Sequence, residues 1–183
     1  MSFVPLAAGK EAELRWVRSA PAKNEFDLLA GDDRLAQLRW SKTAGSLATV
    51  EASGTSWTVK RGGFLNPHVT LRAAGGSTDL ARVTIHWNQH RIEVPGQGAF
   101  PFRRAGLLVP AWEVLGPGSA RLAHIEPVRE ARKLVGGTVE IAPNQLPATT
   151  VLLLVVLAWY FIVLAWFEDE ALADWSDYVE GRT

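Results

Sequence analysis

The sequence predicts a mainly β protein, a closed antiparallel β-barrel of about twelve strands that encloses one apolar C-terminal α-helix. Three observations lead to this prediction. Short segments between residues 13 and 142 alternate apolar and polar side chains. Turn residues separate these segments at a spacing of roughly ten residues. Finally, the run from Val151 to Phe167 contains no charged residue and no helix breaker.

The alternating segments have the period of half-buried strands. In "TSWTVKR", Trp57 and Val59 are expected on one face, while Thr58 and Lys60 are expected on the other. Connectors such as "AGDD", "RGGFLNP", "AAGGST" and "PGQG" are rich in turn-forming residues. This order of short strands and tight turns favours a sandwich or barrel over repeated βαβ units.

One segment near the end of the predicted wall has two interpretations. "EPVREARKLVGG" is compatible with a short helix capped by Gly136, and also with a strand pair bent at Gly136 and Gly137. The clear alternation of the overlapping "GGTVEIA" favours strands.

The apolar run that follows predicts a helix about 25 Å long, at a rise of ~1.5 Å per residue. Pro147 precedes the run, and Thr149 or Thr150 is a candidate N-cap. The helix is apolar around its whole circumference, so it must be enclosed by protein or by lipid.

The run lies near the lower length limit for a membrane span, which is about 17 residues. Basic residues upstream and an acidic tail downstream would then place the strands in the cytoplasm. The alternative interpretation is therefore a tail-anchored single-pass membrane protein with a cytoplasmic β domain and a transmembrane helix at 149–167. We favour a core helix, because a barrel of about twelve strands leaves a lumen that something apolar must fill. The charged "EDE" directly after the run would also be a poor membrane anchor.

The length of 183 residues fits a single domain. We expect barrel strands over 13–142, a buried central helix over 148–170 and an acidic C-terminal tail over 171–183. Nineteen basic and nineteen acidic residues cancel, which argues against a nucleic-acid partner. There is no cysteine, which excludes disulfides, thiol catalysis and Cys-ligated zinc, and which fits a cytoplasmic protein. No signal peptide is expected from the first residues.

No catalytic or metal-binding motif stands out. His86 and His90 are four residues apart in "HWNQH", but the segment reads as the end of a strand and a turn, where that spacing does not form a metal pair. His68 and His124 are single histidines in strand patterns. We therefore expect no enzyme activity, no cofactor and no metal.

Basic residues in three segments are the candidate binding residues. We expect them to bind anionic lipid at the barrel exterior. Arg103 and Arg104 are adjacent, so in a regular strand they point to opposite faces. The complete set is Lys60, Arg61, Arg103, Arg104, Arg129, Arg132 and Lys133.

The stretch "GGTVEIAPNQLPATTVLLLVVLAWYFIVLAWFEDE", residues 136–170, resembles the last strand, loop and central helix of the Tubby C-terminal-like superfamily. That superfamily includes the LURP-one-related proteins and the phospholipid scramblases. The resemblance implies a closed twelve-stranded barrel around a hydrophobic helix. It also implies a non-enzymatic binding or adaptor module in the cytoplasm, peripheral to membranes, with anionic phospholipid headgroups or a protein as partner. Neither a tubby phosphoinositide motif nor an acidic calcium loop is present.

Overall fold

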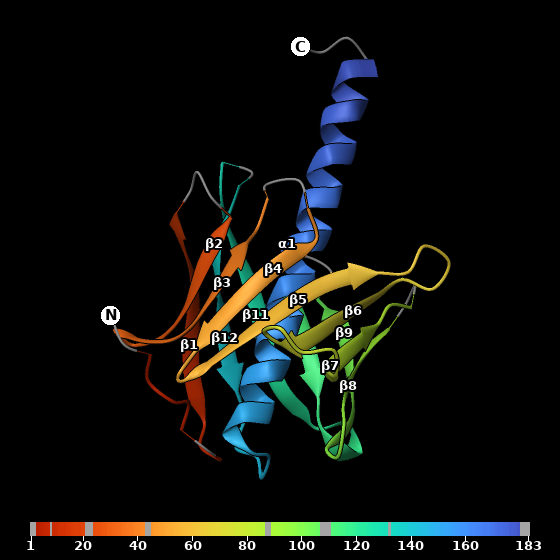
Figure 1. Ribbon diagram of the computed structural model, residues 1–183. Coiled ribbons are helices and arrows are strands. Elements are labelled where there is room, and N and C mark those ends of the chain that lie inside the picture. Colours follow the sequence, from red (N-terminus) through yellow and green to blue (C-terminus); the bar gives the residue numbers. More distant parts are fainter. Residues whose placement is uncertain are drawn as a thin grey trace.

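The computed structural model describes residues 3–7, 9–20, 24–42, 45–86, 89–106, 111–131 and 133–179, with side chains up to Phe167. In these residues twelve antiparallel strands form one closed barrel around a single α-helix (Figure 1). The first six strands are β1 (Ala12–Ala20), β2 (Glu25–Ala30), β3 (Asp33–Trp40), β4 (Leu47–Ala52), β5 (Thr55–Gly62) and β6 (His68–Ala73). The others are β7 (Asp79–Thr84), β8 (His90–Val94), β9 (Gly98–Ala105), β10 (Ala111–Leu115), β11 (Arg121–Glu130) and β12 (Lys133–Ile141). A 3₁₀ turn, η1 (Pro117–Ser119), connects β10 to β11.

Each strand pairs with its neighbours in sequence, and β1 closes the barrel against β12. Closure gives each strand two partners, so the barrel presents no open sheet edge. The prediction of a closed barrel of about twelve strands is confirmed. The ambiguous segment is also a strand pair, as favoured: β11 turns at Ala131 into β12. Gly136 and Gly137 lie inside β12 and pair with β1, so they do not form a bend.

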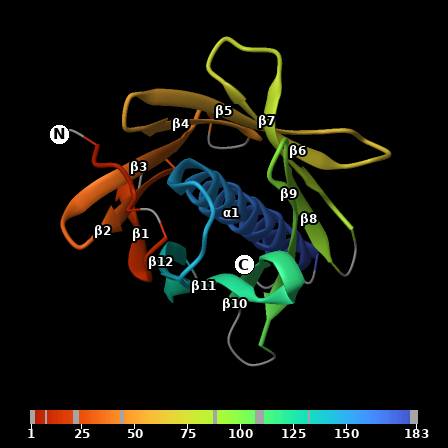
Figure 2. The same ribbon diagram turned by 90° about the horizontal axis from the view of Figure 1, so that it is seen from below.

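Helix α1 (Ala148–Val179) runs through the centre of the barrel (Figure 2). The amide of Val151 donates to the carbonyl of Pro147, so Pro147 is the N-cap residue and the expected cap at Thr149 or Thr150 is wrong. The helical backbone continues past the boundary expected at residue 170. Side chains are buried from Val151 to Val163 and partly exposed over 164–167, so burial ends earlier than expected.

The helix and the wall pack through aromatic side chains. Trp159 stacks on Trp16 of β1 with ring centroids 5.4 Å apart, and Tyr160 stacks on Trp40 of β3 at 5.3 Å. Gly137 leaves room for this packing, because a Cβ there would lie 2.7 Å from the Trp159 ring. Glycine at this position therefore serves the close approach of helix and strand.

The segment Ala148–Phe167 is long and apolar enough to cross a membrane. In this structure it fills the barrel instead, with 83% of its most apolar window buried. Burying each large apolar side chain contributes about 1.5–3 kcal/mol, so the helix supplies a major part of the core. The structure confirms the favoured interpretation, in which the helix lies inside the protein.

Candidate functional site

The two ends of the barrel differ because the helix enters at one and leaves at the other. It enters where β12 finishes, after the segment 142–147, and it leaves where β11 turns into β12 (Figure 1). We call these the entry end and the exit end. Antiparallel connectivity also places the β5–β6 and β9–β10 connections at the exit end.

Arg103 and Arg104 of β9 point to opposite faces, as the sequence predicts. On the outer face, Arg103 forms an ion pair with Glu113 of β10, with its Nη2 3.2 Å from Oε2. Arg104 points inward and lines a small cavity beside the helix residues Ile162 and Ala165. It makes no hydrogen bond or ion pair with the part of the chain that the structure describes.

Arg129 of β11 borders the same cavity. Its guanidinium carbon lies 4.1 Å from the ring centroid of Trp166 on the helix, a cation–π contact. The cavity measures about 50 Å³, and its other wall residues include Trp112 and Pro127. Two guanidinium groups and two indoles therefore meet where the helix leaves the barrel.

Two further inward-facing arginines lie at the exit end. Arg18 of β1 donates to Oδ1 of Asn24 at 2.8 Å, and its guanidinium lies 5.9 Å from the ring centroid of Phe26. Arg61 of β5 comes two residues after the buried Val59 and interacts with Tyr160 of the helix. We call Arg18, Arg61, Arg104 and Arg129 the mouth arginines.

The hydroxyl of Tyr160 lies in the barrel interior, below the mouth arginines. Burial raises the pKa of Tyr160 to about 12, although the backbone and the charge of Arg61 act in the opposite direction. The phenol donates a hydrogen bond to the carbonyl of Ser46, in the β3–β4 connection. The desolvation of this buried group outweighs the neighbouring positive charge.

The predicted basic residues therefore divide between two faces. Arg61, Arg104 and Arg129 are on the inner face at the rim, so these three do not lie on the outer surface of the wall, where lipid binding is expected. The reason is strand alternation, which continues to the rim and carries each of them inward. The exposed Lys60, Arg103 and Lys133 are on the outer face, and Arg132 lies outside the described residues.

The six described members of the set nevertheless share the exit end. Lys60 and Arg61 are near the end of β5, Arg103 and Arg104 near the end of β9, and Arg129 and Lys133 beside the β11–β12 turn. The chain has no net formal charge, and Glu130 and the acidic helix residues 168–170 lie at the same end as these basic groups. Clustered cations attract ligands of the opposite charge locally.

His90, His124 and His68 lie at separate places. His90 is on the inner face with its ring centroid 4.3 Å from that of Phe161, and burial, followed by the charge of His86, lowers its pKa. On the outer face, His124 Nε2 is 3.0 Å from a Glu126 carboxylate oxygen. His68 contacts the carbonyl of Asn66. In the described residues, no group of three or more metal-ligating side chains is close enough to hold an ion.

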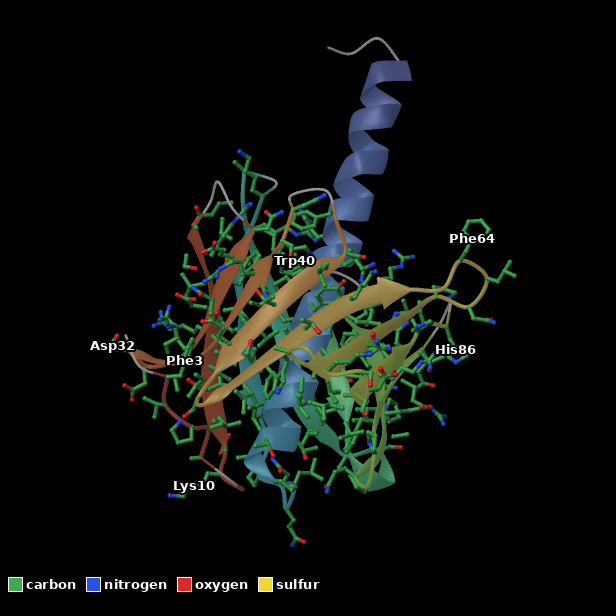
Figure 3. All side chains as sticks on the ribbon, viewed as in Figure 1. Phe3, Lys10, Asp32, Trp40, Phe64 and His86 are labelled. Atoms are coloured by element: carbon green, nitrogen blue, oxygen red, sulfur yellow. The ribbon has the colours of Figure 1, made fainter. Side chains whose placement is uncertain are left out.

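The β5–β6 loop carries two functional candidates that the sequence analysis did not identify. Phe64 and Leu65 are both exposed at its tip, and the loop projects from the barrel with Phe64 pointing into solvent (Figure 3). The pattern of "RGGFLNP" predicts only a turn. The available signal was the presence of two adjacent large apolar residues between glycines and an Asn-Pro pair. Arg18, at the mouth, was also missed.

A larger cavity of about 320 Å³ lies at the entry end. It is enclosed by the η1 region on one side and by the segment that precedes the helix on the other. Arg121 is the one charged residue among the described wall residues, and Asn144 is fixed within the wall by an internal turn to Leu146. The cavity is far from the exit end and shares no residue with it.

Comparisons with models of protein families, with curated proteins and with solved structures give no match to this chain.

Proposed function

We propose that this protein is a non-enzymatic binding module that attaches to anionic lipid surfaces through its exit end. The observation that carries the proposal is the gathering of Lys60, Arg61, Arg104, Arg129 and Lys133 at that end. The resemblance to the Tubby C-terminal-like superfamily supports the same class of partner. It is an argument from likeness alone and adds no residue to the site.

The chemistry of the site suits phosphate-bearing headgroups. Guanidinium groups present several N–H donors in a fixed plane and bind phosphate oxygens in pairs. With respect to the described residues, Arg104 makes no polar contact, and Arg129 places the face of its guanidinium group against Trp166. Each basic residue close to an anionic membrane contributes about 1 kcal/mol to the free energy of membrane binding. Salt limits the range of this attraction to ~10 Å.

The test compares two double variants with the same change in charge. Arg104→Gln/Arg129→Gln alters the exit end, and Lys10→Gln/Arg121→Gln alters exposed residues at the entry end. We would measure sedimentation with phosphatidylcholine vesicles, with and without phosphatidylserine. The exit-end variant is expected to lose about 2 kcal/mol, or roughly thirtyfold in partition coefficient, and the entry-end variant much less.

Equal binding of the wild type to neutral and anionic vesicles would contradict the proposal, as would equal losses in the two variants. Circular dichroism checks that the variants remain folded. Carbonate washing of membranes tests the alternative of a single-pass anchor. That alternative requires α1 to leave the barrel, so it predicts protein that stays in the washed pellet and needs detergent.

A further inference from the structure

We propose that Phe64 and Leu65 form a membrane-inserting tip, which enters the interfacial layer of an anionic bilayer and sets the orientation of the barrel. This inference rests on the proposed function and adds the element that penetrates the lipid. It concerns the β5–β6 loop and not the mouth arginines.

The exposure of these two side chains is exceptional for this protein. Phe64 is 100% exposed and Leu65 is 86% exposed, whereas Val128, the next most exposed large apolar residue described, reaches 44%. Single exposed apolar residues are common on soluble proteins and need no explanation. Two adjacent ones at the end of a projecting hairpin present nearly all of their apolar surface to water.

The loop is held in shape by its own contacts, so the exposure is a property of the fold. Gly63 has a positive φ of 77°, and a Cβ at this position would collide with the carbonyl of Asn66. The His68 ring nitrogen Nδ1 lies 2.9 Å from that same carbonyl. The amide of Ile85 bonds to the carbonyl of Pro67 at 3.3 Å. The root of the loop is thereby attached to the barrel, while the tip points away from it.

The surroundings of the loop have the charge that an anionic surface requires. The loop itself, residues 62–67, carries no charge. Behind it, the exposed Lys60 lies on the outer face of β5, beside the exposed Leu47 of β4. Arg91 is exposed on β8, at the same end of the barrel. An apolar tip with cations set behind it matches a bilayer, in which anionic headgroups lie above the acyl region.

The small size of the tip favours a membrane over a protein partner. A stable protein interface buries about 800 Å² on each partner and has a complementary shape. Two side chains at a hairpin end present far less than that area. Bilayer insertion needs no complementary surface, because each apolar group that enters the interface contributes by itself.

The absence of cysteine from the chain gives a direct test. Phe64→Cys introduces one thiol, which can be labelled with a polarity-sensitive fluorophore. Ser77→Cys, in the exposed β6–β7 turn at the entry end, is the matched control. With vesicles of phosphatidylcholine and phosphatidylserine, the label at 64 is expected to shift to the blue and to be quenched by bromolipids. The label at 77 is expected to remain in water.

A second experiment measures the contribution of the tip. Phe64→Ser/Leu65→Ser is expected to lower the vesicle partition coefficient about tenfold or more, with an unchanged melting temperature because both side chains are exposed. Val4→Ser, an exposed apolar position whose amide bonds to the carbonyl of Arg34 at the entry end, is the control and is expected to bind like the wild type.

The possible results separate the two proposals. If the protein sediments with anionic vesicles while the label at 64 stays in water, the insertion proposal is wrong and the electrostatic one stands. If the serine double variant binds as well as the wild type, the insertion proposal is again wrong. If the wild type does not bind anionic vesicles, both proposals are overturned.

Discussion

Replacing Gly137 by alanine tests the contact between the helix and the barrel wall. The added Cβ would lie 2.7 Å from the Trp159 ring and 2.8 Å from the carbonyl oxygen of Glu126. Neither neighbour can move freely. Trp159 is held by its stack on Trp16 and by an edge contact with Phe26 at 5.6 Å, and the carbonyl belongs to the neighbouring strand.

The expected cost follows from these distances. Overpacking of a tight core costs about 1–3 kcal/mol. For a chain of this size each kcal/mol lowers the melting temperature by about 2–4 °C. Gly137→Ala should therefore melt about 2–12 °C below the wild type in a thermal unfolding experiment followed by circular dichroism.

The control is Gly116→Ala, whose Cβ would meet its nearest atoms at 3.7 and 3.8 Å with an ordinary φ of −87°. It should melt at or slightly above the wild-type temperature, because alanine restricts the unfolded chain. Trp159→Phe should lessen the cost of Gly137→Ala in a double-mutant cycle. A Gly137→Ala variant with wild-type stability and no coupling to Trp159 would refute the packing of helix against wall described above.

Three further predictions concern two buried titratable side chains and the acidic residues that follow the apolar part of the helix. Because burial raises the pKa of Tyr160 to about 12, the unfolded chain releases this proton near pH 10 while the folded protein keeps it. Stability should thus fall as pH rises from about 10 to 12, and Tyr160→Phe should remove that part of the fall in alkaline urea titrations. The pKa of His90 is lowered, so the unfolded state takes up its proton first as pH drops below about 6.5. Stability should decline there, and His90→Gln should flatten the decline in urea melts at successive pH values. The helix carries the acidic residues 168–170 just beyond the end of the barrel at which the mouth arginines lie. Converting their carboxylates to amides should strengthen sedimentation with anionic vesicles, and an unchanged or weaker affinity would contradict an electrostatic role of the exit end.

The sequence determined the nature of the wall and of its filling, because both follow from local patterns. Trp57 and Val59 lie on one face of a strand and Lys60 on the other, and this alternation indicates a strand with one buried face. A run that is apolar on all sides must be enclosed, and a barrel of about twelve strands has the space to enclose it. The opposite directions of Arg103 and Arg104 also follow from the period of a strand.

The inward direction of the mouth arginines was readable in principle. Arg61 has the same parity as Trp57 and Val59, and Arg104 has the same parity as Phe102. The parity alone would suggest a buried charge, which is unfavourable without a partner. The charge is tolerated because these arginines lie at the rim of the barrel, where the helix leaves. Their place along the barrel axis is set by strand pairing between residues far apart in the sequence.

The tertiary structure alone decided three other features. Gly136 and Gly137 resemble a bend in sequence, but they lie in a continuous strand because a helix residue occupies the space in front of Gly137. Phe64 and Leu65 have the composition of core residues, yet they are exposed because the loop turns away from the barrel. The basic residues, scattered between positions 60 and 133, meet at one end because up-and-down connectivity returns alternate connections to the same end. Local patterns fix which face of a strand is apolar, whereas strand register, barrel closure and the position of the helix depend on contacts between distant residues.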